Sequence, residues 1–267
     1  MVHRRTTLAG ALALTAAILF SPFLTVPAHA TGPSYVALGD SYSSGVGTRT
    51  YIDDGTSCDR STYAYPYLVA QAKGYQLSFQ ACSGATTSTV SSGQLGTLSS
   101  TTRYVTISVG GNDAGFSNVI TTCAEPGWMS DCNGAIDKAQ SFITNTLPGR
   151  LSTLYAAIRA KAANAKVVVV GYPRLFNGED CNAGTWFSPT EESRLNQTAD
   201  LLNSKTSAAA TARGFTFANP TSRFIGHAVC GDPEWLNGLS NPVSESYHPN
   251  RTGQASGYVP LVGPLLG

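Results

Sequence analysis

Short apolar runs alternate with longer amphipathic stretches along this chain of 267 residues. Five runs fit strands, at residues 35–38, 76–81, 103–109, 166–171 and 215–218. The fourth run contains four consecutive valines, which is typical of a strand that is buried on both faces. Because these runs alternate with helical patterns, we expect an α/β fold with a parallel sheet covered by helices on both faces.

Four stretches have a helical pattern, at residues 63–73, 132–163, 188–213 and 250–262. The second is expected to break near Pro148, since proline cannot continue a helix interior. The third has a clear start, with Ser188 at the cap, Pro189 at the first helical position and Glu191 three residues after the cap. Residues 88–102 are rich in Ser, Thr and Gly and predict a surface excursion.

The first three predicted strands each end in a turn of small and polar residues. These turns are Gly39-Asp40-Ser41, residues 82–87 and residues 110–113. The carboxyl ends of parallel strands share one edge of the sheet, which is where open α/β sheets bind ligands. A single pocket can form there, with Ser41 either as a nucleophile or as the cap of the next helix.

Residues 1–30 have the pattern of a secretion signal. Arg4 and Arg5 are followed by a mostly apolar run at 8–24 and by the small-x-small cleavage site Ala28-His29-Ala30. The arginine pair also fits a twin-arginine signal, so both export routes stay open. Removing 30 of the 267 residues leaves 237 at positions 31–267, enough for one domain, and no repeat or linker divides them.

The net charge of the mature chain argues against nucleic acid and acidic membranes as partners. The signal holds two of the 17 basic residues and none of the 16 acidic ones, so the mature chain has 15 basic and 16 acidic side chains and a net charge of −1. A chain with this balance has no strong attraction to nucleic acid or to acidic membranes. The mature chain is expected to lack a transmembrane segment and to be a monomer.

All six cysteines lie after the predicted signal, at Cys58, Cys82, Cys123, Cys132, Cys181 and Cys230. An even number in an exported chain indicates disulfides, and no pair has the two-residue spacing typical of zinc or redox sites. Fifteen pairings are possible. We favour the sequential one, which closes three separate loops, and we expect neither a metal nor another cofactor.

The mature chain has two histidines, His227 and His248. A general base that works near neutral pH is most often histidine, although a lone histidine is more commonly structural. His227 precedes Cys230, in a stretch that the cysteine is expected to hold. His248 lies just before the predicted terminal helix and is the stronger candidate for a base.

Four blocks, taken in order, resemble the SGNH (GDSL-type) hydrolases. They are Gly39-Asp40-Ser41, Gly84, Gly110-Gly111-Asn112-Asp113 and His248-Pro249-Asn250. The resemblance spans nearly the whole mature chain, and the length, signal and cysteines further resemble secreted actinomycete lipases and a phospholipase of the A1 type. It implies a single-domain, three-layer α/β/α (flavodoxin-like) fold with a five-stranded parallel sheet in the order 2-1-3-4-5.

The resemblance also assigns roles to residues. Ser41 is implied as the nucleophile and His248 as the base that activates it. The backbone N–H groups of Ser41 and Gly84, together with the side-chain amide of Asn112, are implied as the oxyanion hole, which stabilises the charge of the tetrahedral intermediate.

One position departs from the family pattern. Family members commonly have Asp three residues before the histidine, and this chain has Glu245 there. Either the Glu245 carboxylate orients the imidazole, or a backbone carbonyl of Glu245 or Ser246 does so. We favour the Ser246 carbonyl, because it requires no buried charge.

These features predict an extracellular serine hydrolase that acts on carboxylic esters of lipids, as a lipase or a phospholipase A1, with its substrate at an interface. Residues 172–176 and the pair Trp186-Phe187 either line an acyl-chain pocket or belong to the core. The alternatives are a carbohydrate acetylesterase and, from another class, a secreted binding module with an inactive site. Motifs for zinc hydrolysis and nucleotide binding are missing from the sequence.

Overall fold

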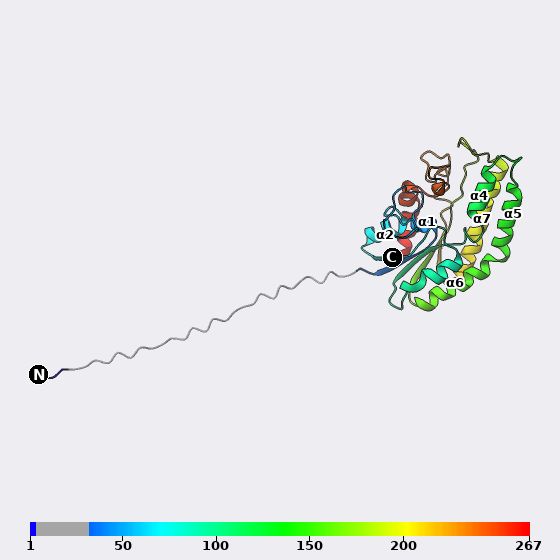
Figure 1. The fold of residues 1–267 in the computed structure, drawn as a ribbon. Coiled ribbons are helices and arrows are strands. Elements are labelled where there is room, and N and C mark those ends of the chain that lie inside the picture. The colour runs from blue at the N-terminus through cyan, green and yellow to red at the C-terminus, as the bar shows by residue number, and fades with distance from the viewer. Residues whose placement is uncertain (4–31) are drawn as a thin grey trace. The chain divides into compact units, whose positions relative to one another are not determined.

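Five parallel strands form the centre of the molecule (Figure 1). They are β1 (Ser34–Gly39), β2 (Gln76–Phe79), β3 (Tyr104–Ser108), β4 (Lys166–Val170) and β5 (Thr216–Ala218). Their order in the sheet is β2-β1-β3-β4-β5, which confirms the 2-1-3-4-5 order. This computed structural model describes residues 1–3 and 32–267. Most of the predicted signal, including its cleavage site, lies outside the described residues.

The strands are apolar because the sheet is covered on both faces. Val105 pairs with Val36 on one side and with Val167 on the other, and all three are buried. The four valines of β4 are at most 2% exposed, which confirms a strand that is buried on both faces. Contacts between these side chains and the covering helices form one continuous core.

Eight α-helices are present in the described residues. Their bounds are α1 (Ser41–Ser44), α2 (Tyr65–Lys73), α3 (Thr87–Gly93), α4 (Phe116–Ala124), α5 (Cys132–Asn145), α6 (Leu147–Lys161), α7 (Pro189–Ala212) and α8 (Val259–Leu266). Two short 3₁₀ turns, η1 (Leu95–Thr97) and η2 (Val243–Glu245), and a π-helix, η3 (Gly253–Tyr258), complete the structure. Among the described residues, no helix is long and apolar enough to cross a membrane.

The helices lie in two layers, so the fold is the expected three-layer α/β/α arrangement. Helices α2 and α8 pack on one face of the sheet, with η3 against both. Helices α5, α6 and α7 pack on one another, and α7 contacts β4 and β5. Figure 1 shows α4 to α7 on the side of the sheet opposite α2.

Local sequence signals account for most of these elements. The predicted helix at 132–163 divides at Thr146 into α5 and α6, with Pro148 in the first turn of α6, as expected. Helix α7 begins with the predicted capping box, in which the Ser188 hydroxyl and the Glu191 carboxylate each accept an N–H of the other residue's backbone.

Most of residues 88–102 are exposed, as expected for a surface excursion, but the segment also contains α3 and η1, which were not predicted. A capping box between Thr86 and Thr89 starts α3, and Val90 is fully buried. The Gln94 side chain then bonds both backbone groups of Gly39, at 2.7 Å to the N–H and 2.9 Å to the carbonyl. These tertiary contacts fix a segment whose composition alone favours irregular structure.

Two other helical segments differ from the prediction. Helix α4 was not predicted, since it follows Gly115 in the left-handed region and has no side-chain cap to mark its start. The terminal helix predicted to end at residue 262 continues to Leu266, and its first part is the π-helix η3. Val262 and Leu266 are fully buried against the core, which explains the longer helix.

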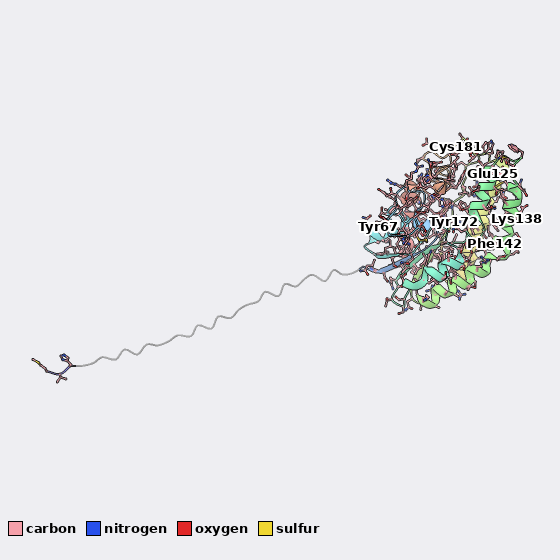
Figure 2. All side chains as sticks on the ribbon, viewed as in Figure 1. Tyr67, Glu125, Lys138, Phe142, Tyr172 and Cys181 are labelled. Carbon is pink, nitrogen blue, oxygen red and sulfur yellow. A yellow bond between two sulfur atoms is a disulfide. The ribbon has the colours of Figure 1, made fainter. Side chains whose placement is uncertain are left out.

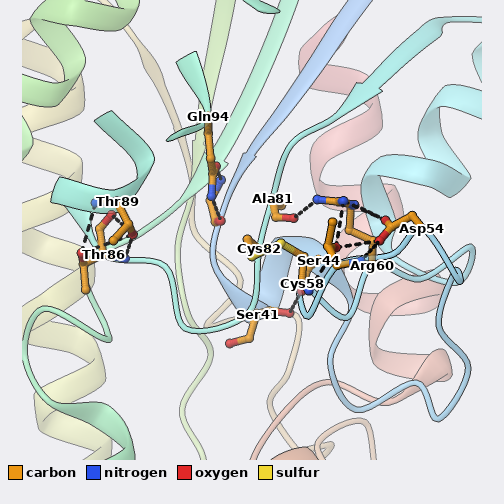
Figure 3. The surroundings of a disulfide bond; sticks show 12 residues. Ser41, Ser44, Asp54, Cys58, Arg60, Ala81, Cys82, Thr86, Thr89 and Gln94 are labelled. Carbon is orange, nitrogen blue, oxygen red and sulfur yellow. Dashed lines mark hydrogen bonds and ion pairs between the residues drawn. A yellow bond between two sulfur atoms is a disulfide. The ribbon is translucent and has the colours of Figure 1, made fainter. Parts of the chain in front are cut away.

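The six cysteines form three disulfides with the sequential pairing, Cys58–Cys82, Cys123–Cys132 and Cys181–Cys230. The first joins the loop between α1 and α2 to the turn after β2 (Figure 3). In that turn the N–H of Cys82 donates to the carbonyl of Gly39 at 3.0 Å. This disulfide therefore ties together the loops that flank Ser41.

Candidate active site

Ser41 lies at the carboxyl edge of the sheet because β1 ends in a sharp turn. Gly39 has φ +120°, and a Cβ at this position would lie 2.3 Å from the Ser108 carbonyl oxygen, so the turn requires glycine. Asp40 then caps α1, its carboxylate accepting the N–H of Tyr42 at 3.1 Å. Ser41 is the first residue of α1 and is 7% exposed.

Asp40 is held on both of its carboxylate oxygens. One oxygen also accepts the Ser108 hydroxyl at 2.8 Å, and the other accepts the Tyr172 hydroxyl at 2.5 Å. Burial raises the pKa of Asp40 to about 6, although these hydrogen bonds act to lower it. The side chain joins the ends of β1, β3 and β4, as expected for a residue that holds the turn.

The structure places His248 beside Ser41. The Nε2 atom of His248 is 2.8 Å from the Ser41 hydroxyl oxygen, and its Nδ1 atom is 2.9 Å from the Ser246 carbonyl oxygen. A carbonyl oxygen can only accept, so Nδ1 carries the proton and Nε2 is the acceptor. This is the tautomer that a base needs in order to take the proton of a serine hydroxyl.

An unusual backbone conformation brings the Ser246 carbonyl to His248. Tyr247, between these two residues, has φ +59°, in the left-handed region. Its N–H donates to the Asn237 carbonyl at 2.9 Å, and its own carbonyl accepts the Tyr42 hydroxyl at 2.7 Å. The segment that carries His248 is therefore tied to α1, the element that carries Ser41.

Glu245 bonds other groups instead of the imidazole. One carboxylate oxygen accepts the Tyr51 hydroxyl at 2.6 Å, and the other lies 3.6 Å from Nε of Arg49. Glu245 is 3% exposed, and its carboxylate holds the loop after α1. Among the described residues, it forms no hydrogen bond with His248, whose Nδ1 is occupied by the Ser246 carbonyl.

Burial also determines the charge of His248. It lowers the pKa of the imidazole to about 4, while the hydrogen bond to the Ser246 carbonyl acts in the opposite direction. The imidazole is therefore neutral at neutral pH. A neutral imidazole with its lone pair directed at a serine hydroxyl is the resting state of a general base.

Hydrogen bonds link the turns that carry the three predicted oxyanion donors, from Cys82 to Gly39 and from Asn112 to Ala85. The N–H of Ser41 is in the first turn of α1, where N–H groups have no partner within the helix. The Asn112 amide nitrogen donates to the Ala85 carbonyl at 3.0 Å, which fixes its position and leaves its second N–H for another acceptor. Gly84, next to Ala85, has φ +75°, and a Cβ there would have no heavy atom within 4 Å.

A second contact holds the turns of Gly84 and Asn112 together. The carboxylate of Asp113 accepts the N–H of Thr87 at 2.8 Å and the Thr87 hydroxyl at 2.6 Å. Arg150 lies 3.3 Å from the same carboxylate. The ends of β1, β2 and β3 therefore meet at one site, as expected from the sequence.

A narrow cavity of about 70 Å³ lies directly beside Ser41. Ser41, Asn112 and Tyr172 line its polar end. The rest of its wall is apolar and comes from helices α4, α5 and α7 and the segment after β4, with Ile120, Ile143, Leu175, Leu195 and Leu202 among the lining residues.

The structure divides the residues proposed for an acyl-chain pocket. Tyr172 and Leu175 line the cavity, whereas Phe176 and Phe187 are buried in the core, with ring centroids 4.8 Å apart. Trp186 is 56% exposed. The sequence alone does not separate pocket residues from core residues here, because both sets have apolar side chains.

The His227 side chain is held by contacts with Trp235 and Pro233. Its ring stacks on Trp235 with centroids 3.9 Å apart, and its Nδ1 atom lies 2.8 Å from the Pro233 carbonyl oxygen. The hydrogen bonds of Tyr42 to the Tyr247 carbonyl and of Tyr172 to Asp40 were not predicted, because each joins residues far apart in the chain.

The chain is similar to known proteins over nearly the whole of residues 32–267. The family model described as the GDSL-like lipase/acylhydrolase family matches residues 37–255. Lipase 1 of Streptomyces coelicolor is 47% identical over 239 residues, which cover 88% of this chain and 87% of the lipase. The crystal structure of the extracellular lipase from Streptomyces rimosus is 42% identical, with a TM-score of 0.82, covering 88% of this chain and 100% of that chain. The crystal structure of phospholipase A1 from Streptomyces albidoflavus is also 42% identical, with a TM-score of 0.83, covering 87% and 99%.

Proposed function

Because the chain belongs to the GDSL-like lipase/acylhydrolase family and is a carboxylic ester hydrolase, we propose that it cleaves lipid esters outside the cell through an acyl-enzyme on Ser41. The observation that carries the mechanism is the 2.8 Å contact between the Ser41 hydroxyl and Nε2 of His248. A nucleophile and a base at this distance form the central element of serine hydrolysis.

The reaction begins when Nε2 of His248 takes the proton of the Ser41 hydroxyl as its oxygen attacks the ester carbonyl. The imidazolium that forms keeps its Nδ1–H on the Ser246 carbonyl, 2.9 Å away. It then gives the Nε2 proton to the departing alcohol oxygen, which leaves an acyl group on Ser41. Water, deprotonated by the same nitrogen, releases the acid and restores the serine.

The negative charge of each tetrahedral intermediate falls on the former carbonyl oxygen. The N–H groups of Ser41 and Gly84 and the second N–H of the Asn112 amide are the donors proposed for it. The Asn112 amide is already fixed by its bond to Ala85 and needs little reorganisation when the charge develops. Removing one such donor typically costs about 3–4 kcal/mol of transition-state stabilisation.

We place the acyl chain of the substrate in the apolar cavity beside Ser41. A hydrocarbon chain leaves water when it enters a wall of Ile, Leu and Ala side chains, at roughly 0.8 kcal/mol for each buried methylene. An acetyl group has no chain to fill such a cavity, so the cavity favours longer acyl esters over acetylated sugars. The similar proteins are lipases and a phospholipase A1, which agrees with this choice.

The extracellular location is supported by three observations. The sequence of residues 1–30 has the pattern of a secretion signal, and all six cysteines are paired as disulfides in the described residues. The lipase of Streptomyces rimosus is described as extracellular.

A substrate panel tests the proposal. The mature protein is assayed on phospholipids, triacylglycerols, p-nitrophenyl esters and acetylated sugars, with positional analysis of the released fatty acids. An organophosphonate should label Ser41 stoichiometrically in the wild type and should leave Ser41→Ala unlabelled. Activity on acetylated sugars alone would favour the acetylesterase, and the absence of an adduct would favour a binding module.

A further inference from the structure

Exposed apolar side chains gather around the groove that contains His248. Seven large hydrophobic residues are exposed among residues 32–267: Tyr63, Trp128, Met129, Trp186, Ile225, Leu239 and Val243. Trp186, Leu239 and Val243 line a groove of about 390 Å³ together with His248. Trp128 and Met129 lie in a loop whose residues Glu125 and Pro126 line the same groove.

We call five residues the apolar rim: Trp186, Leu239 and Val243, which line the groove, and Trp128 and Met129, which follow the lining residues Glu125 and Pro126 in the chain. Trp128 is 84% exposed and Val243 71% exposed, so these side chains leave most of their surface in water. Isolated exposed apolar residues are common, but a cluster beside a functional groove marks a surface that binds a partner.

The chain holds the rim in place from several sides. The Cys123–Cys132 disulfide closes the loop that carries Trp128, and within it the N–H of Met129 donates to the Pro126 carbonyl at 2.7 Å. The N–H of Trp186 donates to the Ala124 carbonyl at 3.2 Å, which joins the two tryptophan-bearing loops.

A second disulfide lies on the other side of the rim. The N–H of Leu239 donates to the Asn182 side chain at 3.2 Å, next to the Cys181–Cys230 disulfide. Figure 2 shows Glu125 and Cys181 at the same end of the domain. The rim is therefore a fixed surface built from three separate segments.

The charges around the groove indicate the nature of the partner. Among the described residues that line it, Glu125 is the only charged one, and no Lys or Arg is present. An anionic surface would gain nothing from this groove. Tryptophan combines a large apolar ring with an N–H donor and prefers the boundary between lipid and water.

We propose that the apolar rim docks the enzyme on an uncharged or zwitterionic lipid surface, so that an ester passes from the aggregate to Ser41 without crossing water. This inference rests on the proposed function, since it requires a lipid ester as substrate. His248 lines the groove and its Nε2 atom is 2.8 Å from the Ser41 hydroxyl oxygen, so a surface seated on the rim lies close to the reacting atoms. The rim binds by burying apolar area.

Vesicle binding tests the rim separately from chemistry. The mature protein with Ser41→Ala is mixed with phosphatidylcholine vesicles, which it cannot consume, and bound protein is measured by sedimentation. Adding Trp128→Ser and Met129→Ser should lower the partition coefficient at least tenfold. The matched control is Ile225→Ser, a residue that is 72% exposed and lies outside the rim, and it should leave binding unchanged.

Activity supplies a second readout in proteins that keep Ser41. Trp128→Ser with Met129→Ser should lower the rate on phosphatidylcholine vesicles about tenfold and leave the rate on a dissolved, monomeric p-nitrophenyl ester within about twofold. Neither side chain lines the groove, and circular dichroism checks that both variants fold. If the loop variant were unfolded, Val243→Ser on the second segment would replace it and should weaken vesicle binding to a smaller degree.

Three results would overturn the inference. The first is vesicle binding that is equal in the rim variants and the control. The second is binding that weakens strongly when salt is raised, since that would assign it to charged headgroups. The third is a dimer that the rim substitutions convert to a monomer without changing vesicle binding, since the rim would then join two copies. Failure of the wild type to hydrolyse even dissolved esters would instead refute the proposed function, whatever the vesicle result.

Discussion

Replacing Glu245 with glutamine tests which group orients the His248 imidazole. Glutamine keeps the size and shape of the side chain and removes its charge. If the Ser246 carbonyl holds Nδ1, as its distance of 2.9 Å indicates, the imidazole loses nothing directly. If the Glu245 carboxylate were a true triad acid, the same change would lower turnover by roughly 10,000-fold.

The expected size of the effect follows from the contacts of Glu245. The Tyr51 hydroxyl, 2.6 Å from one carboxylate oxygen, can donate equally to an amide oxygen, so this hydrogen bond survives. The other oxygen loses the 3.6 Å ion pair with Arg49, whose side chain is 61% exposed. The Glu245 carboxylate is buried, but the guanidinium is open to solvent and the contact is long, so we expect the pair to contribute only about 1 kcal/mol. We therefore expect kcat to stay within about threefold and stability to fall by about 1 kcal/mol or less.

The assay is steady-state hydrolysis of a dissolved p-nitrophenyl ester, with thermal melting as the check on folding. Tyr51→Phe is the matched control, because it removes the donor to Glu245 and leaves the carboxylate in place. His248→Ala defines the activity that remains without a base. A folded Glu245→Gln protein whose kcat falls to the His248→Ala level would refute the carbonyl assignment and restore a triad.

Four further predictions follow from the site. Ser41→Ala and His248→Ala should each lower kcat by several orders of magnitude in a folded protein. His227→Ala removes a ring stacked on Trp235 and should retain most of the wild-type kcat, and reversed outcomes for the two histidines would disprove the base assignment. Asn112→Ala should lower kcat roughly 100- to 1,000-fold with little change in KM, and a change in KM alone would remove Asn112 from the oxyanion hole. Because the folded-state pKa of His248 is depressed to about 4, kcat/KM should fall only as the pH falls through about 4, and an acidic limb near pH 6.5 in the rate profile would contradict this. The stability that neutral His248 contributes above its ordinary pKa should be lost as the pH falls from about 6.5 to about 4. Replacing Cys181 and Cys230 with Ser opens a link between residues 49 positions apart and should cost about 4 kcal/mol, seen as a lower Tm in thermal melting; an unchanged Tm would contradict it.

Much of the fold could be predicted from the sequence because the signals for its strands and helices are local. Four consecutive valines predicted β4, and the Ser188 and Glu191 pair predicted the start of α7. Residues 88–102 lie mostly at the surface as expected, but the pairing of Gln94 with Gly39, 55 positions away, was not predicted. No local pattern contains that information.

The site could be predicted in part for the same reason. Four ordered motifs led to the proposal of Ser41, Gly84, Asn112 and His248 as site residues, and the shared edge of a parallel sheet predicted that the turns of Ser41, Gly84 and Asn112 meet. The hydrogen bond of Asp40 to Tyr172 and the contact of Glu245 with Tyr51 join residues 132 and 194 positions apart. Likewise, the exposure of Trp186 and the burial of Phe187 next to it depend on how the loops close, which adjacent residues do not reveal.

The distance along the chain between Ser41 and His248, the proposed nucleophile and base, has a consequence for folding. Ser41 and His248 are 207 positions apart, and the hydrogen bond from Tyr42 to the Tyr247 carbonyl joins the first helix to the last loop. Gln254 adds a second link, accepting the N–H of Tyr65 and donating to the Tyr42 carbonyl. Contacts of such high sequence separation are slow to form. Under the proposed mechanism, a nascent or refolding chain gains hydrolytic activity only after its C-terminal segment has docked, so the onset of ester cleavage during refolding reports that docking.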